Sequence, residues 1–328
     1  MLGVELAPEE PLDALAALGE RAERAGFDAA LTSCHYNNRD PLLAAQRVAA
    51  ATDDLLVGPA AANPYDTHPV KLAGQVATLA EASGGRAVLG LAPGDRSTLA
   101  NLGVDRDRPL RRVLESMTVA RDLWAGERVD HDGTFVAREA GLNFSVDPVP
   151  VYVGAQGPDM LRMAGKHADG ALVNASHPAD AAWAADRLAE GVADRPADRD
   201  PLDWVLYAVT SVAEDRGAAR DAARFPVAFV AAGADEAVLD RHGLDREAVA
   251  DVAAAVEAGE FRTAADRVTA AMLDAFCVAG TPGEVADGLA ALRAHGDGVV
   301  AGWPLGPDRE AAIGHLADAL DLRPGRGQ

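Results

Sequence analysis

Short apolar runs alternate with longer segments of helical periodicity along most of the chain. The apolar runs are rich in Val, Leu and Ala, which is typical of buried β-strands. They predict strands at residues 2–6, 29–32, 55–60, 87–91, 151–154, 170–174, 204–212 and 298–301. Helical patterns follow nearly all of them, at residues 12–25, 42–51, 70–82, 110–125, 160–167, 179–193 and 310–320. About eight such βα units in 328 residues favour a (β/α)8 TIM barrel over an open, doubly wound sheet.

Two segments interrupt this rhythm. Residues 128–150 contain several Gly and Pro residues and predict an excursion after the fourth strand. Residues 216–276 are mostly helical and predict a longer insertion before the last strand. No linker is long or polar enough to separate independent domains, so we expect residues 1–328 to form a single α/β barrel domain with these two insertions.

The chain is strongly acidic. Asp and Glu number 51 against 30 Lys and Arg, for a net charge of −21, and Lys71 and Lys166 are the only lysines. Such a surface repels phosphate backbones, which argues against nucleic-acid binding. It fits either an ordinary soluble surface or adaptation to molar salt, in which hydrated carboxylates keep a protein dissolved. The scarcity of lysine favours salt adaptation and a halophilic archaeon as the source.

The cysteines and the N-terminal region indicate a cytoplasmic protein. Cys34 and Cys277 lie far apart without paired spacing, so we expect reduced thiols and no metal site. The first twenty residues contain five acids and no Lys or Arg, unlike a signal peptide. No apolar run is long enough to span a membrane.

Polar and glycine-rich sequences gather where the predicted strands end. In α/β barrels the chemistry lies at the carboxyl ends of the strands. The first predicted strand ends with Glu5 and Leu6, and the others lead into SCHYNN (33–38), GPAAANPY (58–65), GLAPGDRST (90–98), VGAQGPDM (153–160), NASHP (174–178) and AGWPLGPD (301–308). This pattern predicts a site for a polar cofactor at one rim of the barrel.

Each of these features also has an ordinary structural interpretation. Glu5 is either an exposed edge residue or an inward-facing acid beside apolar walls, suited to proton donation. A lone His35 is more often a solvated loop residue. The loop at residues 154–158 is either a plain turn or a set of backbone N–H groups and a helix N-terminus that receive a phosphate. The fingerprints of P-loops, dinucleotide-binding folds, zinc proteases and serine hydrolases are absent from the sequence.

Several motifs stand in the order and spacing of one family: HYNN, NPY, GRAVLGLAPGD, VYVGAQGPDML, DGALVNAS, VAFVAAG, RHGL, AGTP and AGWPLGPD. In these motifs the chain resembles the luciferase-like superfamily of flavin and deazaflavin barrels. Within that superfamily it resembles the archaeal coenzyme F-420-dependent 5,10-methylenetetrahydromethanopterin reductases, over effectively its whole length. The resemblance implies an oxidoreductase that transfers a hydride from reduced coenzyme F-420, an 8-hydroxy-5-deazaflavin, to a methylene-tetrahydropterin. The product is the 5-methyl form, and F-420 is expected in preference to FMN.

The resemblance also implies roles for individual residues. Glu5 is the candidate catalytic residue, as a proton donor or electrostatic partner for the pterin. No metal ligands are implied. The residues implied to bind the coenzyme are Cys34, His35, Asn37, Ala60, Ala61, Asn63, Pro93, Gly94, Asp95, Ala155, Gln156, Gly157, Pro158 and Asn174.

The sequence departs from the family pattern at two positions and leaves alternatives open. Cys34 stands where the family commonly has Asp, and Ala60 where relatives often have Gly at a non-prolyl cis peptide. The salt-adapted composition favours tetrahydrofolate as the pterin carrier. The alternatives are another F-420-dependent oxidoreductase, an FMN-dependent monooxygenase, or a non-catalytic deazaflavin-binding paralogue. We expect a homo-oligomer, either a dimer or a tetramer.

Overall fold

The computed structural model describes residues 1–322 and contains a parallel barrel. The strands hydrogen-bond in the order β3-β2-β1-β11-β9-β8-β7-β4, and parallel bridges from Val57 to Ala87 and from Ala62 to Leu91 join β3 to β4. The barrel strands are β1 (Leu2–Glu5), β2 (Ala29–Thr32), β3 (Leu56–Pro59), β4 (Leu89–Leu91), β7 (Val151–Ala155), β8 (Gly170–Asn174), β9 (Asp203–Val212) and β11 (Gly298–Leu305). The predicted α/β barrel and its eight strands are therefore confirmed.

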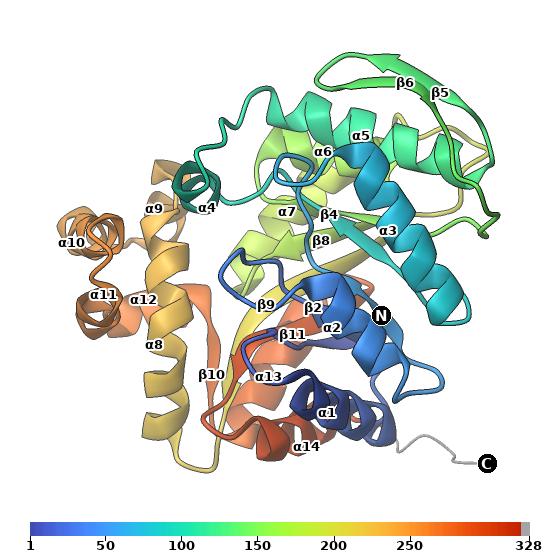
Figure 1. Ribbon diagram of the computed structural model, residues 1–328. Helices are drawn as coiled ribbons and strands as arrows, with labels where there is room; N and C mark the ends of the chain where they lie inside the picture. Colours follow the sequence, from blue (N-terminus) through green and yellow to red (C-terminus); the bar gives the residue numbers. More distant parts are fainter. Residues whose placement is uncertain (323–328) are drawn as a thin grey trace.

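Helices surround the barrel on its outside (Figure 1). They are α1 (Leu12–Ala25), α2 (Pro41–Ala49), α3 (Pro69–Ala82), α5 (Pro109–Trp124), α6 (Pro158–His167), α7 (Pro178–Val192), α13 (Pro282–Arg293) and α14 (Arg309–Ala319). Proline begins most of them, because the first turn of a helix needs no backbone N–H donor. The predicted helices agree with these bounds to within about two residues.

The sequence pattern missed α13 and the short strand β10 (Val278–Gly280), which pairs with β9. Gly283 and Gly288 obscure the helical pattern of α13. Gly288 is needed there, since a Cβ at this position would lie 2.7 Å from Cγ1 of Val278. The last strand also runs on to Leu305, beyond its predicted end at residue 301.

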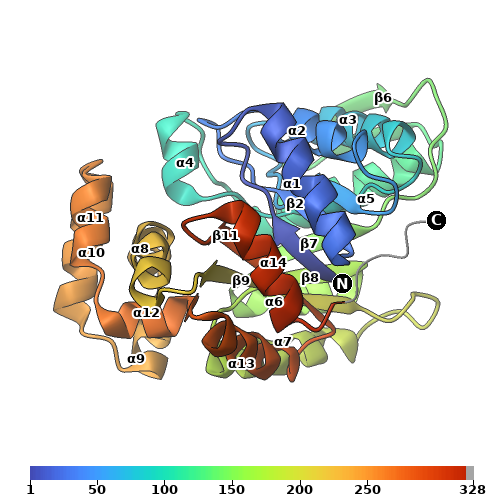
Figure 2. The same ribbon diagram turned by 90° about the horizontal axis from the view of Figure 1, so that it is seen from below.

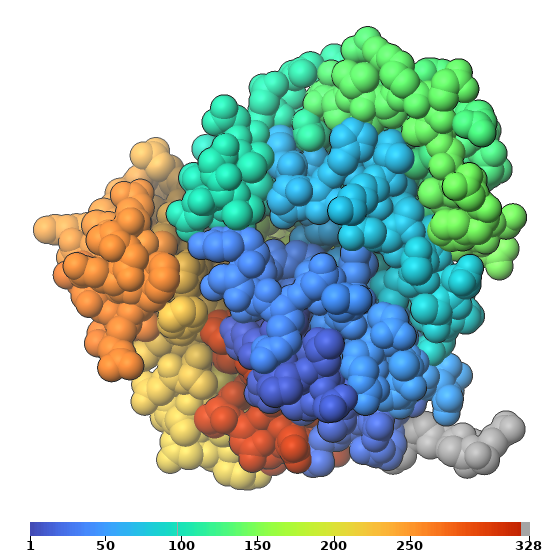
Figure 3. Space-filling view, viewed as in Figure 1, coloured from blue at the N-terminus to red at the C-terminus, as the bar shows by residue number. Residues whose placement is uncertain are grey.

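The two interruptions have different structures. Residues 128–150 contain an antiparallel hairpin of β5 (Val129–Asp132) and β6 (Val136–Ala140). Residues 216–276 form α8 (Arg216–Ala232), α9 (Glu236–His242), α10 (Arg246–Glu257), α11 (Phe261–Arg267) and α12 (Ala270–Phe276), which share an apolar cluster of their own. These helices gather on one side of the barrel, and the space-filling view shows them as an orange and yellow swelling (Figures 2 and 3).

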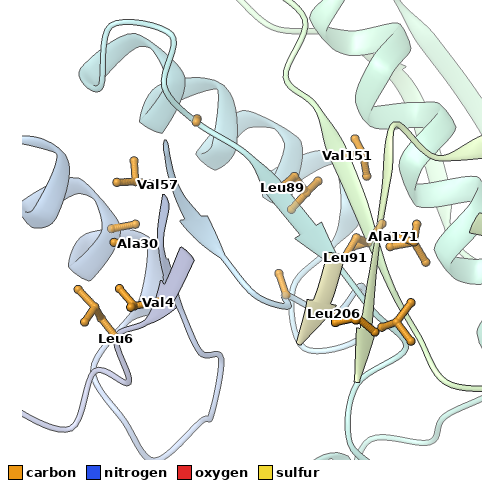
Figure 4. Packing of buried hydrophobic residues seen from close by; sticks show 14 of the residues in the cluster. Val4, Leu6, Ala30, Val57, Leu89, Leu91, Val151, Ala171 and Leu206 are labelled. Atoms are coloured by element: carbon orange, nitrogen blue, oxygen red, sulfur yellow. The ribbon is translucent and has the colours of Figure 1, made fainter. Parts of the chain in front are cut away.

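Side chains alternate along the barrel strands between two apolar layers. Val4, Ala30 and Val57 belong to the outer layer and point toward the surrounding helices (Figure 4). Their inward-facing neighbours fill the barrel with Ala29, Leu31, Val88, Tyr152, Leu172, Val205 and Val300. This packing closes the interior, so any site at the carboxyl ends of the strands is a shallow mouth above a solid floor.

Candidate functional site

Glu5 is the last residue of β1 and lies at the mouth of the barrel. It is 8% exposed, and its Oε2 accepts a hydrogen bond of 2.7 Å from the backbone N–H of Trp303 in β11. A backbone donor of this kind holds the carboxyl group in one orientation. Glu5 is therefore a fixed, largely buried acid at the rim, as predicted, rather than an exposed edge residue.

Two further polar groups lie here: Tyr207 of β9, which the sequence analysis missed, and Ser33 of the SCHYNN segment, to which it assigned no role. Burial raises the pKa of the Tyr207 phenol well above its usual range, and the nearby Glu5 carboxylate raises it further. The approach of the hydroxyl to Glu5 falls short of a regular hydrogen bond, and neither Tyr207 Oη nor Ser33 Oγ has a partner among the described residues. Both hydroxyls are therefore buried polar groups beside Glu5 or the tip of β2 that lack a regular hydrogen bond within the described part of the chain. The inward parity of Tyr207, which it shares with Val205, was the signal that could have revealed it.

The tip of the second strand carries Cys34. Its Sγ approaches the carbonyl oxygen of Thr32 at 3.7 Å. Burial raises the pKa of the thiol, and the negative charges of Asp66, Asp40 and Glu5 raise it further, so Cys34 is a neutral thiol. His35 and Asn37 follow on the loop and are exposed at its edge.

A pocket of about 310 Å³ lies between the loops after β2 and β3 and the first turns of α2 and α3. Cys34, His35 and Asn63 contribute to its lining, together with Asp40 and Asp66. Asn63 is buried, and its polar atoms serve the loop itself. Its Nδ2 donates to Asp66 at 2.7 Å, and its Oδ1 accepts from the backbone N–H groups that follow. Asn63 therefore lines the pocket and stabilises its loop, because both ends of its amide already form hydrogen bonds within that loop.

Small residues from three strand tips meet on one side of the mouth. A Cβ built on Gly154 would lie 2.9 Å from Cβ of Ala92 and 3.7 Å from Cβ of Ala61. The peptide between Ala60 and Ala61 is cis, which answers a point that the sequence left open. Gly94 has φ of 75°, and a Cβ there would lie 3.1 Å from Cβ of Asn63. These residues leave a floor made of backbone and methyl groups, which suits the close approach of a flat ring.

The neighbouring tips of β7 and β8 carry the loop that the sequence assigned to a phosphate. Ala155 is buried, whereas Gln156, Gly157 and Pro158 are exposed at the start of α6, and Asn174 is exposed at the end of β8. Among residues 1–322, no side chain caps the N-terminus of α6, and a Cβ built on Gly157 would meet no heavy atom within 4 Å beyond its chain neighbours. The first backbone N–H groups of the helix therefore face open space.

Pro93 and Asp95 complete the predicted set. Pro93 is half-buried beside Gly94, and the exposed Asp95 accepts a 2.8 Å hydrogen bond from Thr98 N as the N-cap of α4 (Arg96–Asn101). All the predicted residues lie at or shortly after the carboxyl ends of barrel strands, on the same rim. Within residues 1–322, no group of three or more His, Cys, Asp or Glu side chains could hold a metal ion. No helix in that part of the chain is long and apolar enough to cross a membrane.

Comparisons with known proteins agree with this geometry. The family model described as luciferase-like monooxygenase matches residues 2–298. The 5,10-methylenetetrahydromethanopterin reductase of Archaeoglobus fulgidus is 39% identical over 317 residues, covering 95% of this chain and 96% of the relative. The enzyme of the same name from Methanolobus tindarius is also 39% identical, over 316 residues, covering 95% and 96%.

A solved structure of a coenzyme F-420-dependent tetrahydromethanopterin reductase from Methanopyrus kandleri superposes with a TM-score of 0.89 at 34% identity, covering 98% of this chain and 99% of that one. The matches in sequence and in structure both extend over nearly the entire chain. This protein therefore belongs to the luciferase-like monooxygenase family and, within it, groups with the 5,10-methylenetetrahydromethanopterin reductases.

Proposed function

We propose that this protein transfers a hydride from reduced coenzyme F-420 to a methylene-tetrahydropterin and releases the 5-methyl form, acting on a CH–NH group of the pterin. The observation that carries the proposal is the pairing of a fixed, buried carboxylate, Glu5, with a floor of small residues at one barrel mouth. Relatives that share nearly the whole chain carry the reductase name, which supports this activity.

The residues at the mouth fit a deazaflavin. Around Ala61 and Gly154 the strand tips would present only backbone and methyl groups to a flat tricyclic ring, and the uncapped N-terminus of α6 offers N–H groups to a phosphate. We assign Cys34, His35, Asn37, Ala60, Ala61 and Asn63, with Pro93, Gly94 and Asp95, to the ring side, and Ala155, Gln156, Gly157, Pro158 and Asn174 to the ribityl–phosphate side. When bound in its reduced form, the coenzyme supplies the hydride.

Glu5 is proposed to handle the proton. Reduction of the methylene group consumes one hydride and one proton, because the bond between the methylene carbon and the arylamine nitrogen N10 breaks. Glu5 Oε2 is held by Trp303 N–H, so we assign Oε1 to deliver the proton to N10. The barrel supplies alignment, since hydride transfer requires the two carbons to be held at near-contact distance.

The pterin carrier and the cellular setting are finer proposals. The acidic, lysine-poor composition supports a salt-adapted protein with tetrahydrofolate, or a close analogue, as the carrier. The two free thiols support a reducing, cytoplasmic compartment. That the chain forms a single domain, and that it assembles as a homo-dimer or homo-tetramer, are predictions.

The test is anaerobic turnover in concentrated KCl with reduced F-420 and, separately, methylenetetrahydrofolate and methylenetetrahydromethanopterin. Oxidation of the coenzyme on addition of either pterin, with formation of the 5-methyl product, is the expected result. Tight coenzyme binding without oxidation by either pterin would contradict the proposal. It would favour instead a binding-only paralogue or a deazaflavin enzyme with another substrate. The binding-only paralogue is the second candidate, because Cys34 stands where the family commonly has Asp.

A further inference from the structure

Four aromatic residues, three exposed and one half-buried, form a contiguous cluster beside the barrel mouth. Three of them are large side chains open to solvent: Phe225 and Phe229 of α8 are 40% and 37% exposed, and Phe261 of α11 is 43% exposed. The fourth is Trp303 of β11. Ring centroids are 5.8 Å apart between Trp303 and Phe225, 5.2 Å between Phe225 and Phe229, and 5.3 Å between Phe229 and Phe261. We call these four residues the aromatic platform.

The platform is joined directly to Glu5. Trp303 donates its backbone N–H to Glu5 Oε2, so the platform begins at the proposed proton donor. Its indole Nε1 donates to Glu9 Oε2 at 3.1 Å, and Arg309 Nη2 donates to the same oxygen at 2.6 Å. The orientation of the indole is thus set by an ion pair as well as by its neighbours.

The aromatic platform is exposed because α8 buries a different face. Ala223, Val227 and Ala231 lie on its inward face and pack into the apolar cluster of the insertion. Phe225 and Phe229, one helical turn apart, lie on another face. Figure 2 shows this helix beside the end of β11. A contiguous exposed aromatic surface on a chain with a net charge of −21 marks a binding site rather than ordinary surface.

We propose that the aromatic platform binds the aromatic ring in the arm of the pterin carrier. This inference rests on the proposed function. In reduced pterin carriers the arm's aromatic ring is attached to N10, the atom assigned to Glu5. The aromatic platform joins Glu5 through Trp303, and its three phenylalanine rings lie in mutual contact beyond the indole, so the arm's ring would meet them next to N10. Edge-to-face and stacked contacts suit it, and they discriminate a carrier with an aryl arm from a bare pterin.

The test compares two ligands on three proteins at constant, molar KCl. The ligands are tetrahydrofolate and 6-methyltetrahydropterin, which lacks the arm. The proteins are the wild type, Phe225→Ala and Phe144→Ala, where Phe144 is a matched control because it is 41% exposed and lies in the other insertion. Phe225→Ala is expected to weaken tetrahydrofolate binding about tenfold or more. Binding of 6-methyltetrahydropterin and of F-420 should change less than twofold, and Phe144→Ala should match the wild type.

Other outcomes separate the inference from the proposed function. If the wild type binds neither ligand, the inference falls together with tetrahydrofolate as the carrier, whereas turnover with methylenetetrahydromethanopterin still decides the proposed function. If the wild type binds tetrahydrofolate and Phe225→Ala binds it equally well, only the inference is overturned. A change in mass by light scattering without a change in affinity would also overturn it, because the platform would then join two copies of the chain. Phe225→Leu keeps apolar volume without a ring and, should the alanine variant fold poorly, must still weaken tetrahydrofolate binding.

Discussion

The two sides of the barrel mouth are built on different principles. The side assigned to the coenzyme is made of backbone and methyl groups, where Ala61, Ala92 and Gly154 lie in close contact. The side assigned to the pterin is made of large or charged side chains, with Glu5 and Tyr207 at its centre. Under the proposed function, the first side recognises shape, whereas the second supplies charge and a proton. Substitutions on the two sides should therefore fail in different ways.

Glu5→Gln should have the largest effect. The amide keeps the shape of the side chain but removes the proton that N10 needs, so kcat should fall about 100- to 1000-fold. The affinity for F-420 should change less than about twofold, because the coenzyme side is intact. Steady-state kinetics and a coenzyme titration measure the two quantities on one preparation.

The control for this variant is Glu20→Gln on α1, an acid outside the mouth whose loss should leave both quantities unchanged. Equal losses of kcat and of coenzyme affinity in Glu5→Gln would show that Glu5 only shapes the mouth. The division between the two sides would then be wrong.

Gly154→Ala tests the coenzyme side. The added methyl would lie 2.9 Å from Cβ of Ala92, so the floor must shift or lose its space for the ring. Overpacking of this kind costs about 1–3 kcal/mol, and coenzyme affinity should fall roughly tenfold or more. Binding of tetrahydrofolate alone should be unchanged. Gly314→Ala in α14, where a Cβ meets no atom within 4 Å, is the matched control.

The sequence predicted the two sides unequally for a physical reason. Barrel strands are buried on both faces, so they appear as continuous apolar runs and could all be located. The coenzyme side lies in contiguous loops, and motifs such as GAQGP already contain its backbone chemistry. The parity of Tyr207 marks it only as inward-facing, and Phe225 carries no local signal, because each owes its role to a residue distant in sequence, Glu5 for the first and Trp303 for the second. Pattern analysis finds features that one segment encodes and misses those assembled by tertiary packing.

Cys34→Asp tests why the family carboxylate is missing. The thiol is neutral, and the pocket already contains Asp40 and Asp66. A third carboxylate should lower the free energy of unfolding by about 1–3 kcal/mol. Cys34→Asn introduces an uncharged side chain of the same shape as aspartate and should lower the free energy of unfolding by less. Urea denaturation at constant KCl measures both values. If the aspartate variant is as stable as the asparagine variant and turns over much faster, the site has diverged from a more active ancestor.

Tyr207→Phe should produce the smallest effect. Its free energy of unfolding should stay the same or rise, whereas its kcat should fall. The hydroxyl is buried without a regular partner, so its removal should leave the free energy of unfolding unchanged or raise it by up to about 1 kcal/mol. Because the same hydroxyl lies beside Glu5, kcat should fall about three- to tenfold while KM for the pterin changes less than twofold. Tyr152→Phe is the matched control at the other end of the barrel, where the hydroxyl donates to Asp203 at 2.5 Å. Loss of that bond should cost stability without lowering kcat. If both variants lose stability and keep kcat, Tyr207 is a packing residue, and the chemistry of the pterin side is reduced to Glu5.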